Sequence, residues 1–391
     1  MSLTKNIKLL TWFNFFTDFK LYGGIIIIYF VHVTHSYALA ASILSITFIT
    51  AALFDVPTGI FADRLGRKRT IILGALAGVI YAGFYAIGGN YWFLVLGALF
   101  EGFSRALYSG NNNALLHNML ADEGLENEYH VYSGKLNAMF QVGIAVSVIL
   151  GGIIANWSFS YVMWLSIVPQ LFCMFISFQI VDSKRTSQIS TTVLLHLKDG
   201  FLAFIHNSNL RLLSLNSILS EGIGETFFQF QPAFFNALLP IWAIGIVRSL
   251  SNFGAAISFH FSGKVINKLG AIKVILLGQI YNRVIDFISL LFPTIASPFL
   301  MSSTSLTYGT GSVASDTLMQ KEFTDAQRAT MSSLNSFTGS LFYGIFAFFV
   351  GVFADKFGVR NTLIITQVIA LPTLYFVWKL LTLNTNKSTA E

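Results

Sequence analysis

The chain has 391 residues, of which 54% are hydrophobic and 11% are charged, and its mean hydropathy is +0.66. Soluble domains carry about 25% charged residues, so this composition excludes an ordinary water-soluble protein and fits a chain with many membrane spans. The net charge of +6 lies on no basic soluble domain, which excludes a nucleic-acid partner. The single cysteine, Cys173, cannot form a disulfide within the chain, and no cluster of Cys and His has zinc-ligand spacing. We therefore expect no metal, no cofactor and no disulfide scaffold.

Twelve apolar segments follow one another along the chain, and each has roughly the 20 residues that a helix needs to cross a bilayer. They predict an all-α integral membrane protein with twelve transmembrane helices. Most of the connections are very short, and the two longer ones are the acidic stretch 117–131 and the central stretch 182–210. The twelve expected spans are residues 8–31, 37–62, 70–89, 91–116, 132–155, 159–181, 211–234, 238–262, 272–292, 295–318, 328–354 and 361–382.

The basic residues are distributed unevenly between the two sides of these spans. With the N-terminus inside, 18 of the 24 Lys and Arg residues fall on the cytoplasmic side, and only Lys356 and Arg360 fall outside. Cytoplasmic connections of membrane proteins are enriched in Lys and Arg, so the distribution predicts that both termini are cytoplasmic. The remaining four basic residues lie within spans and are Lys20, Arg105, Arg248 and Arg283.

The sequence also repeats itself in two halves. The segment from Gly59 to Arg69, after span 2, aligns without gaps with the segment from Gly263 to Lys273, after span 8, at an offset of 204 residues. Between the halves, residues 190–205 have the pattern of an amphipathic helix on the inner membrane surface. Parallel halves of this kind are typical of transporters. We predict an N-terminal six-helix bundle, a cytoplasmic linker and a C-terminal six-helix bundle, with the bounds 1–181, 182–210 and 211–391.

The loop after span 2 carries the motif G-x-x-x-D-R-x-G-R-K. Its residues here are Gly59, Asp63, Arg64, Gly66, Arg67 and Lys68. Together with the twelve spans, the repeat and the central stretch, this motif makes the chain resemble the major facilitator superfamily (MFS) over essentially its whole length. The resemblance implies two pseudo-symmetric six-helix bundles and, for these residues together with Asp55, a conformational latch between the halves. The alternative is that the basic residues only enforce the topology.

Within that superfamily the chain resembles bacterial efflux-like members, which implies the inner membrane of the cell. Two features depart from the pattern of proton-driven drug antiporters. Arg105 is followed by Gly110, one residue later than in their span 4, and span 5 has Ser147 and Val148 where they have Gly-Pro. These departures leave other MFS substrate classes open.

Several spans carry ionisable side chains, and each of these needs a partner, a cavity or a proton because charge is costly in the bilayer. Glu101 and Arg105 lie four residues apart on span 4 and share a face of the helix. Arg283 and Asp286 lie three residues apart on span 9 and also share a face. Both pairs are therefore expected to neutralise themselves within one helix, and the alternative is a role in substrate binding or coupling.

Glu221 and Glu225 on span 7 form a pair of like charges one helical turn apart. Two carboxylates close together in low dielectric do not both ionise readily, so this pair predicts proton or cation handling. The alternative is that both simply face an aqueous vestibule. Asp18 on span 1 falls within one residue of Glu221 under the repeat offset and is the third candidate for proton coupling. Lys20 is two residues from Asp18, so we expect the two side chains to point apart and to find partners elsewhere.

Further candidates for a substrate cavity come from the same set of spans. Arg248 on span 8 is expected to neutralise a carboxylate across the cavity. Phe228 and Tyr308 indicate an aromatic pocket, although most aromatic residues of a membrane protein face lipid or pack between helices. The substrate-cavity candidates are Lys20, Asn14, Glu101, Arg105, Arg248, Arg283, Asp286, Phe228 and Tyr308.

These features favour a secondary active transporter, in which two bundles rock about a midplane site and give alternating access. No Gly-rich phosphate loop is present to use ATP. We expect proton-coupled export of a small amphipathic compound or drug by a monomer whose partners are that substrate, protons or another coupling ion, and the lipid bilayer. The alternative substrate is a polar metabolite or siderophore, whose anionic group would be bound by Lys20, Arg248 or Arg283. A channel would need a continuous polar pore, and an enzyme would need a converging nucleophile, acid and base; the sequence favours neither.

Overall fold

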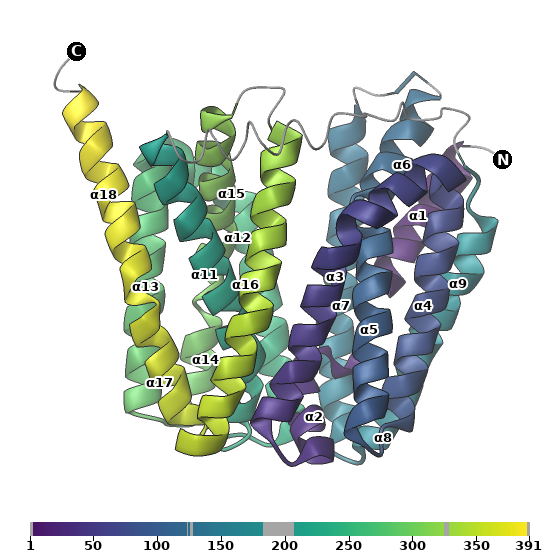
Figure 1. The fold of residues 1–391 in the computed structure, drawn as a ribbon, viewed down its shortest axis with the longest axis horizontal. Coiled ribbons are helices and arrows are strands. Elements are labelled where there is room, and N and C mark those ends of the chain that lie inside the picture. The colour runs from purple at the N-terminus through teal and green to yellow at the C-terminus, as the bar shows by residue number, and fades with distance from the viewer. Residues whose placement is uncertain (1–2, 123, 126–127, 183–206, 324–327, 389–391) are drawn as a thin grey trace. The chain divides into compact units, whose positions relative to one another are not determined.

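The structure is a computed structural model whose described residues form helices and no strand (Figure 1). The described residues are 3–122, 124–125, 128–182, 207–323 and 328–388. The amphipathic helix expected at 190–205 lies outside them. The chain divides into two compact units, Met1–Ile189 with Pro240–Ser249, and Ser190–Leu239 with Leu250–Glu391.

In the first half of the chain, helices lie over the first six expected spans. They are α1 (Leu3–Thr17), the 3₁₀ helix η1 (Leu21–Gly24), α2 (Ile26–Thr34), α3 (Tyr37–Leu65), α4 (Arg67–Ile87), α5 (Tyr91–Tyr108), α6 (Asn111–Ala121), α7 (Tyr129–Ala155), α8 (Phe159–Leu165) and α9 (Ile167–Gln179).

In the second half, helices lie over the other six expected spans. They are α11 (Ser208–Phe235), α12 (Ile241–Leu269), α13 (Ala271–Leu291), α14 (Ser297–Ser302), α15 (Ser305–Glu322), α16 (Arg328–Phe357), α17 (Val359–Ile369) and α18 (Leu371–Ser388).

Eight stretches of helix are long and apolar enough to cross a membrane. They coincide with the expected spans 2, 3, 5, 6, 8, 9, 11 and 12, so a helical membrane protein is confirmed. Helices also lie over spans 1, 4, 7 and 10, but within the described residues these do not meet the same criteria of length and hydropathy. Twelve crossings therefore remain a prediction for these four.

The four spans that do not meet these criteria recur at every third position, and they carry charge. Span 1 holds Asp18 and Lys20, and span 4 holds Glu101 and Arg105. Span 7 holds the two glutamates, and span 10 holds Asp316. A spacing of three is what nested three-helix repeats within each half produce, so these spans occupy equivalent places in the repeat.

Five of the expected spans are interrupted and consist of more than one helix, which the hydropathy pattern does not predict. Span 1 is divided into α1, η1 and α2, and span 4 is divided into α5 and α6 at Gly110, whose φ is +65°. Spans 6, 10 and 12 are divided only at one or two residues whose backbone stays in the right-handed helical region, Ser166, Ser303 with Thr304, and Ala370. Non-helical backbone inside a membrane needs partners for its free polar groups, so the interruptions of spans 1 and 4 require local support.

The predicted repeat is confirmed at the level of whole helices. α3 and α12 begin and end at positions 204 residues apart, and so do α4 and α13. The turn between the two helices is made in both cases by a glycine with a positive φ, Gly66 at +92° and Gly270 at +82°. Glycine adopts this backbone conformation without steric cost, which explains its place in both copies.

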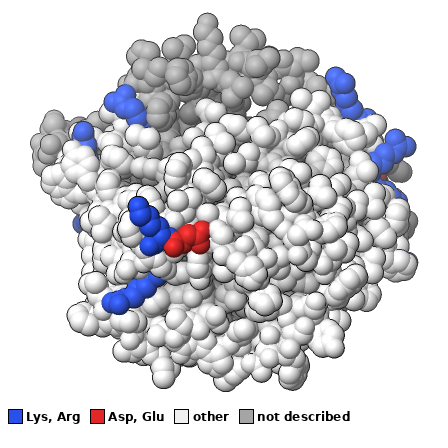
Figure 2. All heavy atoms as spheres, turned by 60° about the horizontal axis from the view of Figure 1, so that its bottom comes forward, with Lys and Arg blue, Asp and Glu red and all other residues white. Residues whose placement is uncertain are grey.

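Much of the surface is apolar, as a lipid-facing protein requires. Only 33–56% of the residues in the eight membrane-spanning windows are buried inside the protein. Trp92 is 71% exposed and Trp157 is 73% exposed, each at the end of a helix, where tryptophan typically marks the membrane interface. The face shown in Figure 2 is almost wholly uncharged, with basic side chains at scattered places.

The apolar core of the first unit packs α1 against α4, α6 and α9. Leu10 and Phe13 of α1 contact a cluster that includes Ile71, Leu116 and Cys173, all fully buried. This packing fixes the end of α1 and therefore positions the polar residues that follow it.

Candidate functional site

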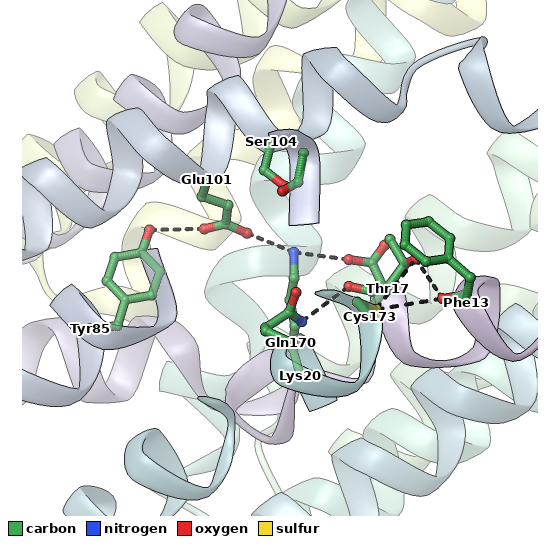
Figure 3. A network of polar contacts seen from close by, with 10 residues as sticks. Phe13, Thr17, Lys20, Tyr85, Glu101, Ser104, Gln170 and Cys173 are labelled. Carbon is green, nitrogen blue, oxygen red and sulfur yellow. Dashed lines mark hydrogen bonds and ion pairs between the residues drawn. The ribbon is translucent and has the colours of Figure 1, made fainter. Parts of the chain in front are cut away.

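A buried ion-pair network lies where span 1 is interrupted (Figure 3). α1 ends at Thr17, so Asp18 and Lys20 lie in non-helical backbone before η1. Lys20 Nζ lies 2.9 Å from Asp18 Oδ1 and 2.8 Å from Oε1 of Glu101 on α5. One ammonium group thus joins two carboxylates from two different spans.

The prediction that Asp18 and Lys20 point apart is wrong. It assumed a continuous helix, on which residues two apart do not face each other. The backbone of Lys20 is extended, with φ −104° and ψ 104°, and this brings the two side chains into contact. Gly23 and Gly24, just beyond, were the sequence signal that the helix is interrupted.

Both oxygens of Glu101 have partners. Tyr85 on α4 donates a hydrogen bond of 2.8 Å to Oε2, and Lys20 occupies Oε1. The expected pairing within span 4 is therefore only partly right: the charge of Arg105 acts on Glu101, but its guanidinium lies over the ring of Phe48, 4.7 Å from the centroid. Glu101 is 9% exposed, so these contacts replace its hydration.

Neighbouring helices support the interruption itself. The buried Gln170 of α9 donates from Nε2 to the free carbonyl of Thr17 at 3.3 Å, which gives the end of α1 a partner. On α7, Gly143 approaches the carbonyl of Phe15, and Gly151 approaches that of Leu21, so closely that a side chain would not fit. Sequence reasoning missed Gln170 and Tyr85 because no local pattern links residues so far apart along the chain.

In the second unit, Glu221 and Glu225 lie on one face of α11 as predicted, and each has a neutral partner one turn away. Ser217 Oγ donates to Glu221 Oε1 at 3.1 Å, and Gln229 Nε2 donates to Glu225 Oε1 at 2.7 Å. Among the described residues, no basic group lies within 4.0 Å of either carboxylate. The two glutamates therefore have hydrogen-bond donors but no counter-ion.

The adjacent α15 adds to this acidic face. Asp316 lies within electrostatic range of Glu221, and Tyr308 lies within range of both glutamates. Tyr308 is 61% exposed and packs edge-to-face on Phe259, with the ring centroids 5.8 Å apart. Towards the end of α15 is a cavity of about 510 Å³, lined by Val313, Asp316, Thr317, Gln320 and Lys321.

Amide and hydroxyl groups join α11 to its neighbours beside the glutamates. Gln279 Nε2 of α13 donates to Asn216 Oδ1 and to Ser220 Oγ, both at 3.1 Å. Asn335 Nδ2 of α16 donates to Ser217 Oγ at 3.3 Å. Sequence reasoning missed this uncharged network because it searched for ionisable residues.

The expected pairing of Arg283 with Asp286 is only partly right: the charge of Arg283 acts on Asp286, but the two side chains are not in direct contact. Among the described residues, no ion pair within 4.0 Å joins them, because Gln367 of α17 lies between. Gln367 accepts from Arg283 through Oε1 and donates from Nε2 to Asp286 Oδ2 at 2.8 Å. These two residues face span 12 and form a group of their own.

Three cavity candidates remain, Asn14, Arg248 and Phe228, and the side chain of Arg248 lies beside Gly24 of η1. Asn14 donates to the Leu10 carbonyl of its own helix at 2.8 Å and accepts from Asn112 at 3.5 Å. Arg248 is 4% exposed on α12, and Phe228 is half-buried on α11.

The motif loop makes hydrogen bonds to other residues of the first unit. Arg67 Nη1 donates a hydrogen bond to Asn111 Oδ1 at 3.4 Å, and Asn111 Nδ2 donates one to the backbone carbonyl of Arg67 at 3.0 Å. The amide of Lys68 donates to Asp182 Oδ2 at 3.3 Å, and the same oxygen lies beside Gly66. Asp55 is half-buried, and Gly59 and Arg64 are exposed. The side chain of Asp63 is not among those that the structure describes. These contacts brace the loop, and a latch between the halves stays a prediction.

Comparison with known proteins identifies the family. The profile of the Major Facilitator Superfamily matches residues 9–342. The chain belongs to the major facilitator superfamily. The resemblance read from the motif loop and the repeat is thereby confirmed.

Two curated relatives and one solved structure illustrate the match. The uncharacterized transporter BU466 of Buchnera aphidicola is 26% identical over 164 residues, which cover 41% of this chain and 40% of that protein. The inner membrane transport protein YajR of Escherichia coli is 25% identical over 257 residues, which cover 63% of this chain and 54% of YajR. The chain thus matches about half or less of these relatives. The nucleoside transporter NupG has a TM-score of 0.82 at 15% identity, with 97% of this chain and 99% of that chain covered, which shows the MFS fold alone.

Proposed function

We propose that this MFS protein is a secondary active transporter that works by alternating access and couples the export of a small amphipathic compound to protons, with Glu221 and Glu225 as the proton-binding residues. One observation carries the proposal: the two carboxylates lie one turn apart on α11 with no basic group within 4.0 Å among the described residues. Two like charges one helical turn apart without a counter-ion favour the binding of a proton or cation. A carboxylate that takes a proton on one side of the membrane and releases it on the other is what coupling requires.

Asp18, the third candidate for proton coupling, differs from the two glutamates because it has a counter-ion. Its partner Lys20 lies 2.9 Å away, so protonation there would break an ion pair. We therefore assign the network of Asp18, Lys20 and Glu101 chiefly to holding the interrupted span 1, with Asp18 as a secondary proton site.

The placement of charge supports a path along spans 1, 4, 7 and 10. Each of these spans carries at least one acidic group, and they recur at every third position along the chain. Charged side chains in a membrane face the bundle interior or a water-filled cavity, because lipid cannot solvate them. Equivalent polar helices in the two halves are the expected walls of a midplane site.

The proposed substrate is amphipathic because of what surrounds the glutamates. The exposed ring of Tyr308 lies beside two carboxylates. An aromatic face next to negative charge suits a compound with an apolar body and a positively charged group.

A carrier for a polar metabolite is the second candidate, and the uncharged network favours it. Gln279, Asn216 and Ser220 offer amide and hydroxyl groups of the kind that bind hydroxylated ligands. NupG, which shares the fold, is a nucleoside transporter by name. Lys20 is less suited to bind an anionic group of such a substrate, because its ammonium group already contacts two carboxylates.

Proton movement in proteoliposomes tests the proposal. Purified protein is reconstituted with an internal pH dye and challenged with amphipathic amines, nucleosides, sugars and short peptides. We expect compound-driven proton flux in the wild type and its loss in Glu221→Gln and in Glu225→Gln. Glu128→Gln, the same change in an exposed residue outside the spans, is the matched control and should behave as wild type. Compound transport without protons, or normal coupling in both variants, would refute the assignment.

A further inference from the structure

Asp286 is a deeply buried carboxyl group with few partners. It lies on α13, whose helix is apolar enough to span the membrane, and its side chain is 4% exposed. Its Oδ2 accepts one hydrogen bond, the 2.8 Å bond from Gln367 Nε2. Its Oδ1 has no hydrogen-bond partner among the described residues.

The nearest positive charge does not contact it. Arg283 reaches Gln367 Oε1, so only an uncharged amide separates the guanidinium from the carboxyl group. Asp18 and Glu101 in the other unit, by contrast, each lie within 2.9 Å of the Lys20 ammonium. Asp286 thus lacks the direct counter-ion that holds those two carboxylates in the ionised form.

An ionised oxygen without a donor is costly to bury, and the cost is larger inside a bilayer. A proton on Oδ1 removes the charge and leaves a neutral carboxylic acid, whose Oδ2 still accepts the hydrogen bond from Gln367.

The other titratable groups around α13 do not supply a missing charge. Arg283 is the one described residue whose charge acts on Asp286. α14 has no titratable residue, and on α17 the Arg360 guanidinium is bound to the carbonyls of Leu290 and Leu291. On α18, Tyr375 and Lys379 are exposed. The titratable residues of α11 and α15 are Arg211, Glu221, Glu225, Tyr308, Asp316, Lys321 and Glu322, and none of them is among the charges that act on Asp286.

We propose that Asp286 carries a proton on Oδ1 at neutral pH, which makes the contact between α13 and α17 a second proton-binding site of the transporter. Loss of that proton would leave a buried charge whose one donor is Gln367. Release of the proton therefore requires either that Arg283 moves towards the carboxylate or that the α13–α17 contact opens. Protonation is in this way linked to the packing of spans 9 and 12, independently of Glu221 and Glu225.

Infrared spectroscopy of the reconstituted wild-type protein tests the proposal without a substrate. We expect the C=O stretching band of a protonated carboxylic acid at neutral pH, its shift on transfer to D₂O, and its loss in Asp286→Asn. Asp18→Asn is the matched control and should leave that band unchanged, because Asp18 is ionised beside Lys20. A spectrum in which Asp286→Asn removes no such band, or a band that does not shift in D₂O, would overturn the proposal.

Thermal stability gives a second readout that does not depend on assigning a band. Asparagine resembles a neutral aspartic acid in size and hydrogen bonding, so Asp286→Asn should melt at or above the wild-type temperature. Asp18→Asn should melt lower, because it leaves Lys20 with one fewer counter-ion. An equal loss of stability in the two variants would show that Asp286 is ionised and would overturn the proposal as well.

Discussion

At the scale of single residues, the carboxylates of the two units differ in how their charge is balanced. Asp18 and Glu101 share the ammonium of Lys20. Glu221 and Glu225 have only neutral donors, from the side chains one turn away on their own helix. Because uncompensated charge is costly in a bilayer, the first pair is suited to support and the second pair to binding a proton or cation.

Lys20→Met tests this division of roles. The substitution leaves two buried carboxylates without their counter-ion, and removing one partner of a buried ion pair costs about 3–5 kcal/mol. We expect a clearly lower melting temperature of the purified protein in detergent. The triple variant Asp18→Asn, Lys20→Met, Glu101→Gln removes all three charges and should recover most of the loss. A Lys20→Met protein that melts like the wild type would contradict the support role.

The sequence identified the charged residues but not their partners. Glu221 and Glu225 were placed on one face because helical periodicity is local. Arg283 and Asp286 interact electrostatically as expected but make no direct contact, because Gln367, more than 80 positions away, takes both hydrogen bonds. Contacts between residues far apart along the chain cannot be predicted from the local spacing of residues in a single sequence.

At the scale of elements, the interruption of span 1 is the feature that builds the first network. Had α1 continued, Asp18 and Lys20 would lie on different sides of a helix. The close approach of α7 to the chain at Phe15 and Leu21 leaves room only for glycine. The interruption is therefore held from outside by α7 and by Gln170 of α9.

Gly151→Ala tests whether α7 holds span 1 in place. The added methyl group would overlap the carbonyl of Leu21, so helix or loop must shift. We expect a lower yield of folded protein and a melting temperature reduced by several degrees. Gly134→Ala on the same helix has nothing within 4 Å of the new methyl group and should be neutral or slightly stabilising. Equal behaviour of the two variants would argue against close packing at this point.

The sequence predicted complete elements better than their interruptions. The offset of 204 residues found in the loop motif extends to the full lengths of α3 and α12. The interruptions of spans 1 and 4 were missed, since an average of hydropathy over a window does not register a change of backbone conformation. Only local residues such as Gly110 or Gly23 mark them.

At the scale of the whole molecule, membership of the MFS, the repeat and the recurrence of polar spans agree with one another. Spans 1, 4, 7 and 10 are the four that, among the described residues, lack a helix both long and apolar enough to cross a membrane, and they recur at every third position. The fold class was accessible from the sequence because composition and periodicity decide it. The substrate was not, because it depends on the geometry of a few side chains that converge only in the folded protein.

Thiol accessibility at position 220 tests alternating access most directly. Ser220 precedes Glu221 near the middle of α11, and replacing the buried Cys173 with alanine leaves no other thiol in the chain. In this background, Ser220→Cys is exposed to a membrane-impermeant thiol reagent in right-side-out and in inside-out vesicles. An alternating-access transporter with its site on α11 predicts labelling from both sides. Labelling from one side only, or none in correctly folded protein, would contradict it.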